Sequence, residues 1–135
     1  MKQWVLCVCM AAVLFLGGPV IGQADENTDA ATAAASLWLE LLDEAKYQEG
    51  WRQASGIFRQ KNTQEEWESK ILSVRTSWGD IVFREHLSID AVPGIAIEES
   101  LSVTFATYLK NKSAVEKITV VKENGIWKVA EYLVE

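Results

Sequence analysis

The spacing of apolar residues changes once along the chain, at Gly79, and this change limits the possible folds more than any other feature. Before Gly79, apolar residues recur every three or four positions, which is the period of an amphipathic helix. After it they alternate with polar residues, which is the period of a strand with one buried face. Helices and strands that occupy separate parts of a chain are typical of an α+β domain. The sequence therefore predicts N-terminal helices packed against a four-stranded antiparallel sheet.

Three helices are expected before Gly79. Their apolar faces consist of Ala31, Ala34, Trp38, Leu41, Leu42 and Ala45 in the first, Tyr47, Trp51, Ala54 and Phe58 in the second, and Trp67, Ile71, Val74 and Trp78 in the third. The third helix opens with a capping box, in which the side chains of Thr63 and Glu66 each accept from the other residue's backbone amide. Gly79 can end this helix with a positive φ. Asp43 precedes the second helix and is expected to accept amide hydrogen bonds from it.

Alternation predicts the strands and their faces. The apolar face consists of Ile81, Phe83, Leu87 and Ile89 in the first strand and of Leu101, Val103, Phe105 and Leu109 in the second. Arg84 and His86 fall on the other face of the first strand, toward solvent or a partner. Pro93-Gly94 is expected to form the turn between these two strands.

Asn124-Gly125 joins the last two strands in a two-residue hairpin, because both positions accept a positive φ. This loop sets Glu123 opposite Ile126, and residues opposite one another share a face of the sheet. Continuing the pairing outward without interruption predicts a core face with Ile118, Val120, Trp127, Val129, Leu133, Glu116 and Glu131. It places Val121, Ala130, Tyr132 and Val134 on the opposite face.

Residues 1–24 are predicted to be a secretory signal peptide cleaved after Ala24, because a basic residue precedes a short apolar run that ends in small residues. The run is shorter than the roughly 20 residues of a bilayer span, and an uncleaved anchor is the alternative. The mature chain is then expected to be periplasmic or secreted, away from the membrane, with a flexible leader (25–33) and a single domain (34–135). Cys7 and Cys9 leave with the signal peptide, so packing alone must stabilise the domain.

Charge and composition exclude several kinds of partner. Removal of Lys2 with the signal peptide leaves 12 basic residues against 19 acidic ones, a net charge of −7. A chain with this charge repels nucleic acid and anionic lipid. His86 is the only histidine, so no site with several histidines can form within one chain. No metal and no cofactor are therefore expected.

Residues spread over most of the mature chain resemble a known family. They are Trp38, Leu39, Asp43, Tyr47, Trp51, Phe58, Trp67, Arg75, Gly79, Arg84, Pro93, Gly94, Glu116, Trp127 and Tyr132. Their order and spacing are similar to those of the bacterial exported family catalogued as domain of unknown function 4019. The resemblance implies a cystatin-like or nuclear transport factor two-like fold, in which a curved antiparallel sheet wraps around helices, and it implies no activity. The chain departs from the family pattern at Ala45, where a glycine is usual, and over residues 95–100.

Two carboxylates are the candidates for catalysis. The predicted register places Glu116 and Glu131 near each other on an apolar face, where one carboxyl can acquire a raised pKa and act as a general base. The alternative is that both are solvated or paired with Arg75. Arg75 lies beside the apolar stripe of its helix, so its guanidinium is expected to reach Asp43, Glu85 or Glu116.

The remaining candidates concern binding. Trp38, Trp67 and Trp127 are expected either to fill the core or to line a cavity, where Arg75 and Glu116 would anchor a ligand. The second face of the sheet is less polar than a solvated surface, so a homodimer or another partner is expected to cover Tyr108, Tyr132, Arg84 and His86.

These observations lead to one expected function and one alternative. The expected function is that of an exported, non-enzymatic domain that binds a small ligand or an envelope protein. The alternative is an isomerase-like or dehydratase-like enzyme in which a carboxylate in a cavity acts as the general base.

Overall fold

The structure, a computed structural model, describes residues 23–92 and 99–135. The chain order of the helices and strands in these residues is α1 (Gln23–Asp43), α2 (Tyr47–Gln53), α3 (Gly56–Lys61), α4 (Gln64–Trp78), β1 (Ile81–Ala91), β2 (Ser100–Leu109), β3 (Ser113–Glu123) and β4 (Ile126–Val134). The expected Pro93-Gly94 turn lies outside the described residues, as does the expected signal peptide except for its last two residues.

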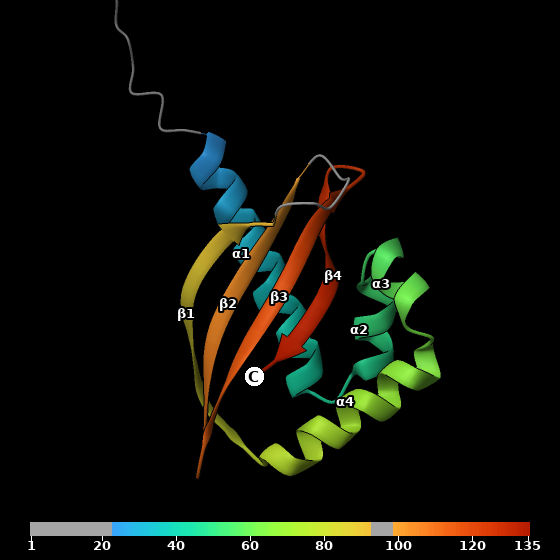
Figure 1. Cartoon of the computed structure of the whole chain (residues 1–135), viewed down its shortest axis with the longest axis vertical. Coiled ribbons are helices and arrows are strands. Elements are labelled where there is room, and N and C mark those ends of the chain that lie inside the picture. Colours follow the sequence, from blue (N-terminus) through green and yellow to red (C-terminus); the bar gives the residue numbers. More distant parts are fainter. Residues whose placement is uncertain (1–22, 93–98) are drawn as a thin grey trace, which may run out of the picture.

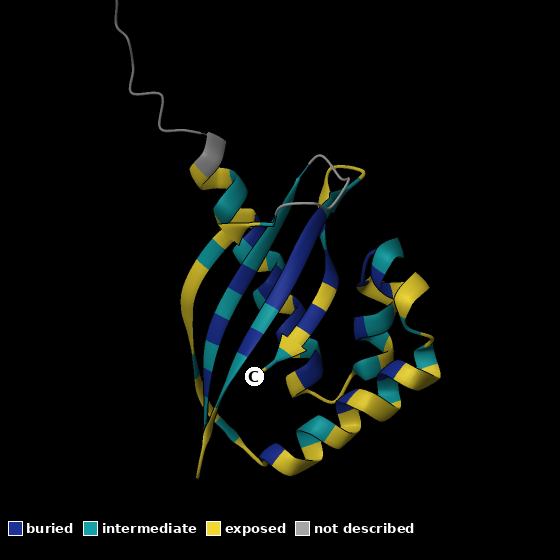
Figure 2. Cartoon of the chain, in the orientation of Figure 1, coloured by how far each residue is buried: buried dark blue, intermediate teal, exposed yellow. Residues whose placement is uncertain are grey.

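The strands form one antiparallel sheet in the order β1-β2-β3-β4, and α1 runs behind it while α4 lies across its lower end (Figure 1). The predicted α+β class, with helices packed against a four-stranded antiparallel sheet, is therefore confirmed. The sheet is buried unevenly, because β1 is exposed along most of its length whereas the central part of β3 is buried (Figure 2).

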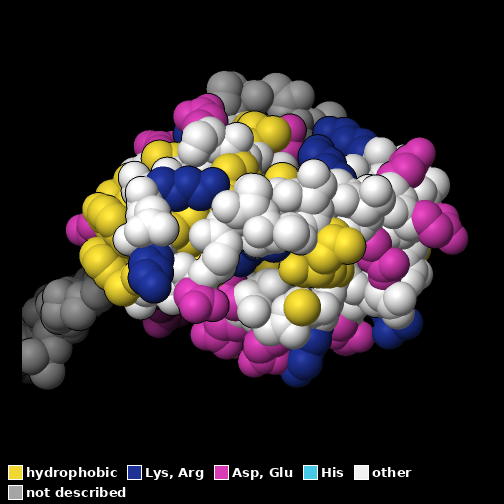
Figure 3. Space-filling model, turned by 90° about the horizontal axis from the view of Figure 1, so that it is seen from below, with side chains coloured by type: hydrophobic (Ala, Val, Ile, Leu, Met, Phe, Trp, Pro, Cys, Tyr) yellow, Lys and Arg dark blue, Asp and Glu magenta, His cyan; other side chains and the backbone are white. Residues whose placement is uncertain are grey.

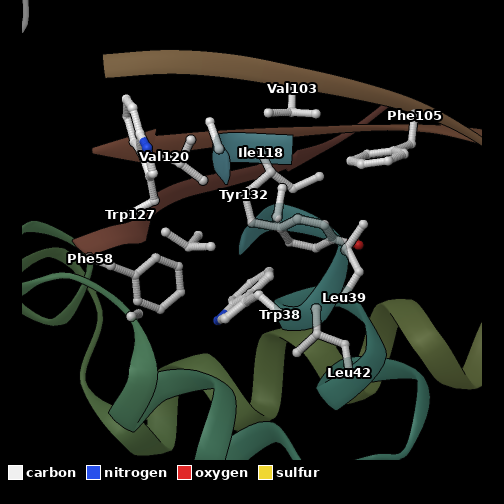
Figure 4. Packing of buried hydrophobic residues seen from close by; sticks show 14 of the residues in the cluster. Trp38, Leu39, Leu42, Phe58, Val103, Phe105, Ile118, Val120, Trp127 and Tyr132 are labelled. Carbon is white, nitrogen blue, oxygen red and sulfur yellow. The ribbon is translucent and has the colours of Figure 1, made fainter. Parts of the chain in front are cut away.

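Aromatic rings fill the space between the helices and the sheet (Figure 4). Trp67 packs against Trp38 with ring centroids 5.5 Å apart and against Phe58 at 4.9 Å. Tyr132 reaches the same cluster from β4, 5.5 Å from Trp38. The indole nitrogens of Trp38 and Trp67 donate to the backbone oxygens of Gly50 and Tyr47, at 2.8 and 3.0 Å, so their polar atoms are satisfied inside the core.

Several local predictions are confirmed. Thr63 and Glu66 form the capping box of α4, with both reciprocal bonds at 3.2 Å. Gly79 follows α4 with a φ of +70°, and Asn124 and Gly125 have φ values of 53° and 79° in the hairpin, with Glu123 opposite Ile126. Each of these features depends on residues close together in sequence, which is why the sequence alone predicts them.

The flexible leader predicted over residues 25–33 is wrong, because these residues belong to α1. Asp25 and Glu26 lie in its first turn, where carboxylates interact favourably with the helix dipole. A run rich in alanine follows, and alanine has the highest helix propensity. Ala31 and Ala35 are fully buried, so packing also stabilises this part of the helix.

The single helix predicted from Tyr47 to Phe58 is two helices. Ala54 is extended, with a ψ of 165°, and separates α2 from α3. The backbone amide of Ser55 donates to the backbone oxygen of Val129 in β4 at 2.8 Å, while its hydroxyl caps α3 by accepting from Phe58. A contact with the sheet therefore interrupts the helix, and the apolar spacing continues across the break.

The predicted faces of β1 hold at Ile81 and Ile89 but are wrong from Phe83 to Leu87, because the pairing with β2 shifts twice, at Val82 and at Leu87. Each shift inserts one residue and moves the following side chains to the other face. Arg84 therefore lies opposite Thr107 on the helix side of the sheet, and His86 lies opposite Phe105. Phe83 and Leu87, predicted on the apolar face, are instead largely exposed.

The predicted register of the last hairpin holds only as far as Val129, which pairs with Val120. A register shift at Ala130 then sets Glu131 opposite Thr119 and Tyr132 opposite Ile118. Tyr132 and Val134 consequently belong to the core side, and Glu131 and Leu133 are exposed. The prediction that Glu131 and Leu133 share the core face with Glu116 is therefore wrong.

The turn between α1 and α2 also differs from the prediction. Asp43 accepts no amide hydrogen bond from α2, whose N-cap residue is Lys46, and binds two arginines instead. Ala45 in this turn has a φ of 59°, a conformation that disfavours every residue except glycine. This is the position at which the resembled family usually has glycine.

We expect Ala45→Gly to increase the free energy of unfolding by about 1 kcal/mol, because the left-handed conformation costs a residue with a Cβ roughly 1–2 kcal/mol. Urea denaturation measures this change. Ala33→Gly, at an exposed helical position of α1, is the control and should lower the free energy of unfolding by about 0.5–1 kcal/mol. A decrease in both variants would contradict the strain at Ala45.

Candidate functional site

The carboxylate of Glu116 lies inside the protein, with no exposed surface, between the sheet and the end of α1. One oxygen, Oε1, accepts from the Thr107 hydroxyl and from the guanidinium of Arg84, whose Nε is 2.9 Å away. The other, Oε2, accepts from the Tyr132 hydroxyl at 2.5 Å and from Arg75 at 3.2 Å. Four side chains from α4, β1, β2 and β4 therefore hold one carboxylate of β3.

Asp43 closes this cluster into a ring. Its Oδ1 accepts from Nη1 of Arg75 at 2.6 Å, and its Oδ2 accepts from Nη1 of Arg84 at 2.8 Å. Two guanidinium groups and two carboxylates thus alternate, so their formal charges cancel. We call Asp43, Arg75, Arg84 and Glu116 the ion ring.

The four side chains of the ion ring differ in their exposure. The exposed fraction increases from 0% for Glu116 to 7% for Arg75, 14% for Arg84 and 29% for Asp43. Asp43 is therefore the member of the ring that solvent reaches most easily. The Arg75 guanidinium also lies 4.8 Å from the ring centre of Trp78, in a cation–π arrangement, and its buried Nε donates to no described group.

Burial and the neighbouring charges shift the pKa values of this cluster in opposite directions. For Asp43, burial alone would raise the pKa, but the hydrogen bonds and charges of Arg84 and Arg75 together lower it below 3.8. For Tyr132, burial and the negative charge of Glu116 hold the pKa well above its ordinary value. The Tyr132 hydroxyl is therefore protonated at neutral pH and remains a donor to Glu116.

The arrangement around Glu116 is suited to stabilising the fold. A general base needs a free lone pair within reach of the substrate, whereas Glu116 is completely covered and its carboxylate is occupied by four donors. The second catalytic candidate, Glu131, is exposed on β4 and faces away from Glu116. The structure does not bring these two carboxylates together.

The candidate ligand-binding residues fall into two places. Arg75 and Glu116 belong to the ion ring, and Trp67 belongs to the aromatic core. Trp38 and Trp127 each present one part to the core and another to an open groove of about 510 Å³ between α1 and β4. We call it the α1–β4 groove; it is lined by Ala30, Ala33, Ala34, Leu37, Trp38, Gln53, Gly125, Ile126, Trp127, Lys128 and Val129.

The candidate interface residues are also separated. Tyr108 is partly exposed on the outer face and stacks on Phe83, with ring centres 4.3 Å apart. Tyr132 is buried in the core and Arg84 in the ion ring, so neither is available to a partner on the outer face. His86 is exposed, with its ring 5.5 Å from that of Phe105 on the helix side of the sheet.

The described part of the chain lacks two features, a membrane-spanning helix and a metal-binding group of side chains. In residues 23–92 and 99–135 no helix is long and apolar enough to cross a bilayer. The same residues contain no group of three or more histidine, cysteine or acidic side chains that could hold a metal ion.

Seen from below, the surface has groups of acidic side chains and scattered basic ones (Figure 3), as a net charge of −6 leads one to expect.

Sequence reasoning missed three members of this cluster, Thr107, Arg84 and Tyr132, the last because the predicted register placed it on the outer face. Thr107 carried a signal, because it is the polar residue in the alternating apolar series of Val103, Phe105 and Leu109. Arg84 carried none, since the shift at Val82 that turns it inward has no sequence pattern of its own. Asp43 and Glu116 were two of the three acceptors expected for Arg75, and both bind it.

We expect Glu116→Gln to lower the free energy of unfolding by about 3–5 kcal/mol, because it leaves two largely buried arginines with Asp43 as their only carboxylate and one positive charge uncompensated. Urea denaturation of both forms measures the change. Glu131→Gln is the matched control and should stay within about 0.5 kcal/mol of the natural chain, since this side chain is exposed. Equal effects at the two positions would contradict the role given to Glu116.

The lowered pKa of Asp43 predicts a dependence of stability on pH. A carboxyl whose pKa is lower in the folded state stabilises the protein above its unfolded pKa and loses this effect as the pH falls through the folded value. The natural chain should therefore be more stable than Asp43→Asn at neutral pH, and the difference should shrink below about pH 4. Urea denaturation of both proteins from about pH 7 to about pH 2 measures it. A difference that does not change with pH would contradict this prediction.

Comparison with known proteins gives a family and no activity. A search of curated proteins found no match. The model of one family, described as protein of unknown function (DUF4019), matches residues 34–132. The match covers α2 to β3 completely, together with the second half of α1 and most of β4, and therefore includes the whole ion ring. The chain belongs to the DUF4019 family.

Proposed function

We propose that this protein is an exported, non-enzymatic binding domain that holds a small apolar molecule in the α1–β4 groove. Export rests on the signal peptide expected at residues 1–24. The helices on one side of a four-stranded sheet support the cystatin-like or nuclear transport factor two-like fold that the family resemblance implies. A fold does not determine a function, so the non-enzymatic role rests on the groove described below.

The observation that carries the proposal is the exposure of large apolar side chains at the edges of the groove. Leu37 in α1 is 62% exposed and Ile126 in β4 is 61% exposed. Between them, small alanine side chains leave the flank of Trp127 accessible. Exposed apolar residues that surround one hollow indicate binding more strongly than the same residues scattered over the surface.

The size and lining of the groove favour a small molecule. Its volume of about 510 Å³ lies within the usual range of small-molecule sites, which are concave and mostly apolar with few polar groups. Gln53 and Lys128 provide polar groups here.

Among the described residues, Trp38 and Trp67, two of the three rings expected to line a cavity, pack instead against each other and against Phe58 and Tyr132. A ligand would therefore bind between α1 and the last hairpin, at the surface of the core. This position differs from the cavity expected from the sequence, although Trp38 and Trp127 contribute to both.

The uncharged apolar dye Nile red tests the groove directly. We expect the natural chain to bind it, and the double change Leu37→Glu with Ile126→Glu to weaken binding at least about tenfold, because removing two apolar contacts costs more than 1.4 kcal/mol. Fluorescence titration of the folded proteins measures the affinity. Leu72→Glu is the matched control, since Leu72 is 55% exposed on α4 and lies outside the groove. Equal loss in the control, or no loss in the double variant, would overturn the proposal.

Mass spectrometry of the protein under native conditions then seeks the natural ligand. We expect a small molecule to accompany the natural chain and to be lost from the Leu37→Glu, Ile126→Glu variant. Retention of the same molecule by this variant would place the binding site elsewhere.

A further inference from the structure

The side chain of Asp43 is held as two arginines would hold any carboxylate. Arg84 donates two hydrogen bonds to Asp43, from Nη1 to Oδ2 at 2.8 Å and from Nη2 to Oδ1 at 3.1 Å. Arg75 donates a third bond to the same Oδ1 at 2.6 Å. Such paired contacts fit the planar carboxylate group and not a spherical anion. The geometry thus depends on the carboxylate and not on the chain that carries it.

The charges around Asp43 define the ligand further. Glu116 neutralises one of the two guanidinium charges from inside the protein, through Arg75 at 3.2 Å and Arg84 at 2.8 Å. Without Asp43 the two arginines and Glu116 would carry one net positive charge that is largely removed from water. A ligand with a single negative charge balances this one positive charge, whereas a dianion would leave the site with a net negative charge.

The site has an opening on the side of Asp43. A hollow of about 550 Å³ lies there, lined by Leu42, Asp43, Tyr47, Arg75, Gly79, Asp80 and Ile81. Asp80 contributes a second negative charge to this hollow, which disfavours large or multiply charged anions. The opening and the charges together suit a small monocarboxylate.

The chain that carries Asp43 is itself under strain. Asp43 is the last residue of α1, and Ala45 two residues later has a φ of 59°. Releasing Asp43 would allow this turn to relax, which offsets part of the advantage that an attached carboxylate has over a free one. Exchange of the two is therefore less unfavourable than at an unstrained ion pair.

We propose that Arg75 and Arg84 form a binding site for a small monocarboxylate, which Asp43 occupies in this structure and vacates when the ligand binds. The site lies at the C-terminal end of α1, whereas the α1–β4 groove is bordered by the middle of this helix, from Ala30 to Trp38, and the two share no lining residue. The experiments that test one proposal therefore do not test the other.

The variants Asp43→Ala and Asp43→Asn test the site, with formate as the probe. Asp43→Ala empties the site, so about 100 mM formate should raise its Tm by about 5 °C more than the same concentration of chloride, for a Kd of about 10 mM. Asp43→Asn fills the site with a neutral side chain of the same shape, so formate and chloride should act alike. Equal effects of the two salts on Asp43→Ala, or the same formate effect in both variants, would overturn the proposal.

The natural chain tests whether formate displaces Asp43 from the two arginines. The backbone amide signal of Ala45 in a nuclear magnetic resonance titration should move with formate and not with chloride, because the turn relaxes when Asp43 leaves. A signal that responds alike to both salts would make Asp43 a permanent part of the ring and would overturn the exchange. This measurement uses the unaltered protein, so it holds even if Asp43→Ala fails to fold.

Discussion

The carboxylate of Glu116, buried without any contact with water, is the constraint on which the arrangement of the elements depends. A carboxylate in this position is strongly unfavourable unless donors and positive charges surround it. The chain supplies them from separate elements: Arg75 from α4, Arg84 from β1, Thr107 from β2 and Tyr132 from β4. Because each arginine also binds Asp43 at the end of α1, the same charge fixes that helix relative to the sheet.

Tyr132 connects this polar cluster with the aromatic core. Its ring packs 5.5 Å from Trp38 and 6.0 Å from Trp67, while its hydroxyl donates to Glu116. The register shift at Ala130 makes this dual role possible, because an uninterrupted strand would turn Tyr132 to the outer face. One inserted residue in β4 therefore completes the aromatic core and supplies one of the four donors to Glu116.

Both proposed binding sites lie at the surface of the molecule. The α1–β4 groove uses the outer flanks of residues that also build the core, so a ligand there would rest on a rigid base. The ion ring lies at the C-terminal end of α1, where exposure increases from Glu116 to Asp43. In both places a rigid interior supports a surface that solvent reaches, which is how most binding sites are built on stable folds.

The sequence by itself determined the features that depend on neighbouring residues: the α+β class from the change of period at Gly79, the capping box at Thr63 and Glu66, and the hairpin at Asn124-Gly125. Only the tertiary structure decided which way Arg84, Glu131 and Tyr132 point, because the shifts at Val82, Leu87 and Ala130 depend on the pairing of strands distant in sequence. It also decided the break at Ser55, whose amide binds Val129 in β4. A single inserted residue reverses every side chain beyond it. An alternating pattern thus predicts that a strand exists, whereas its partner strands decide which face is buried.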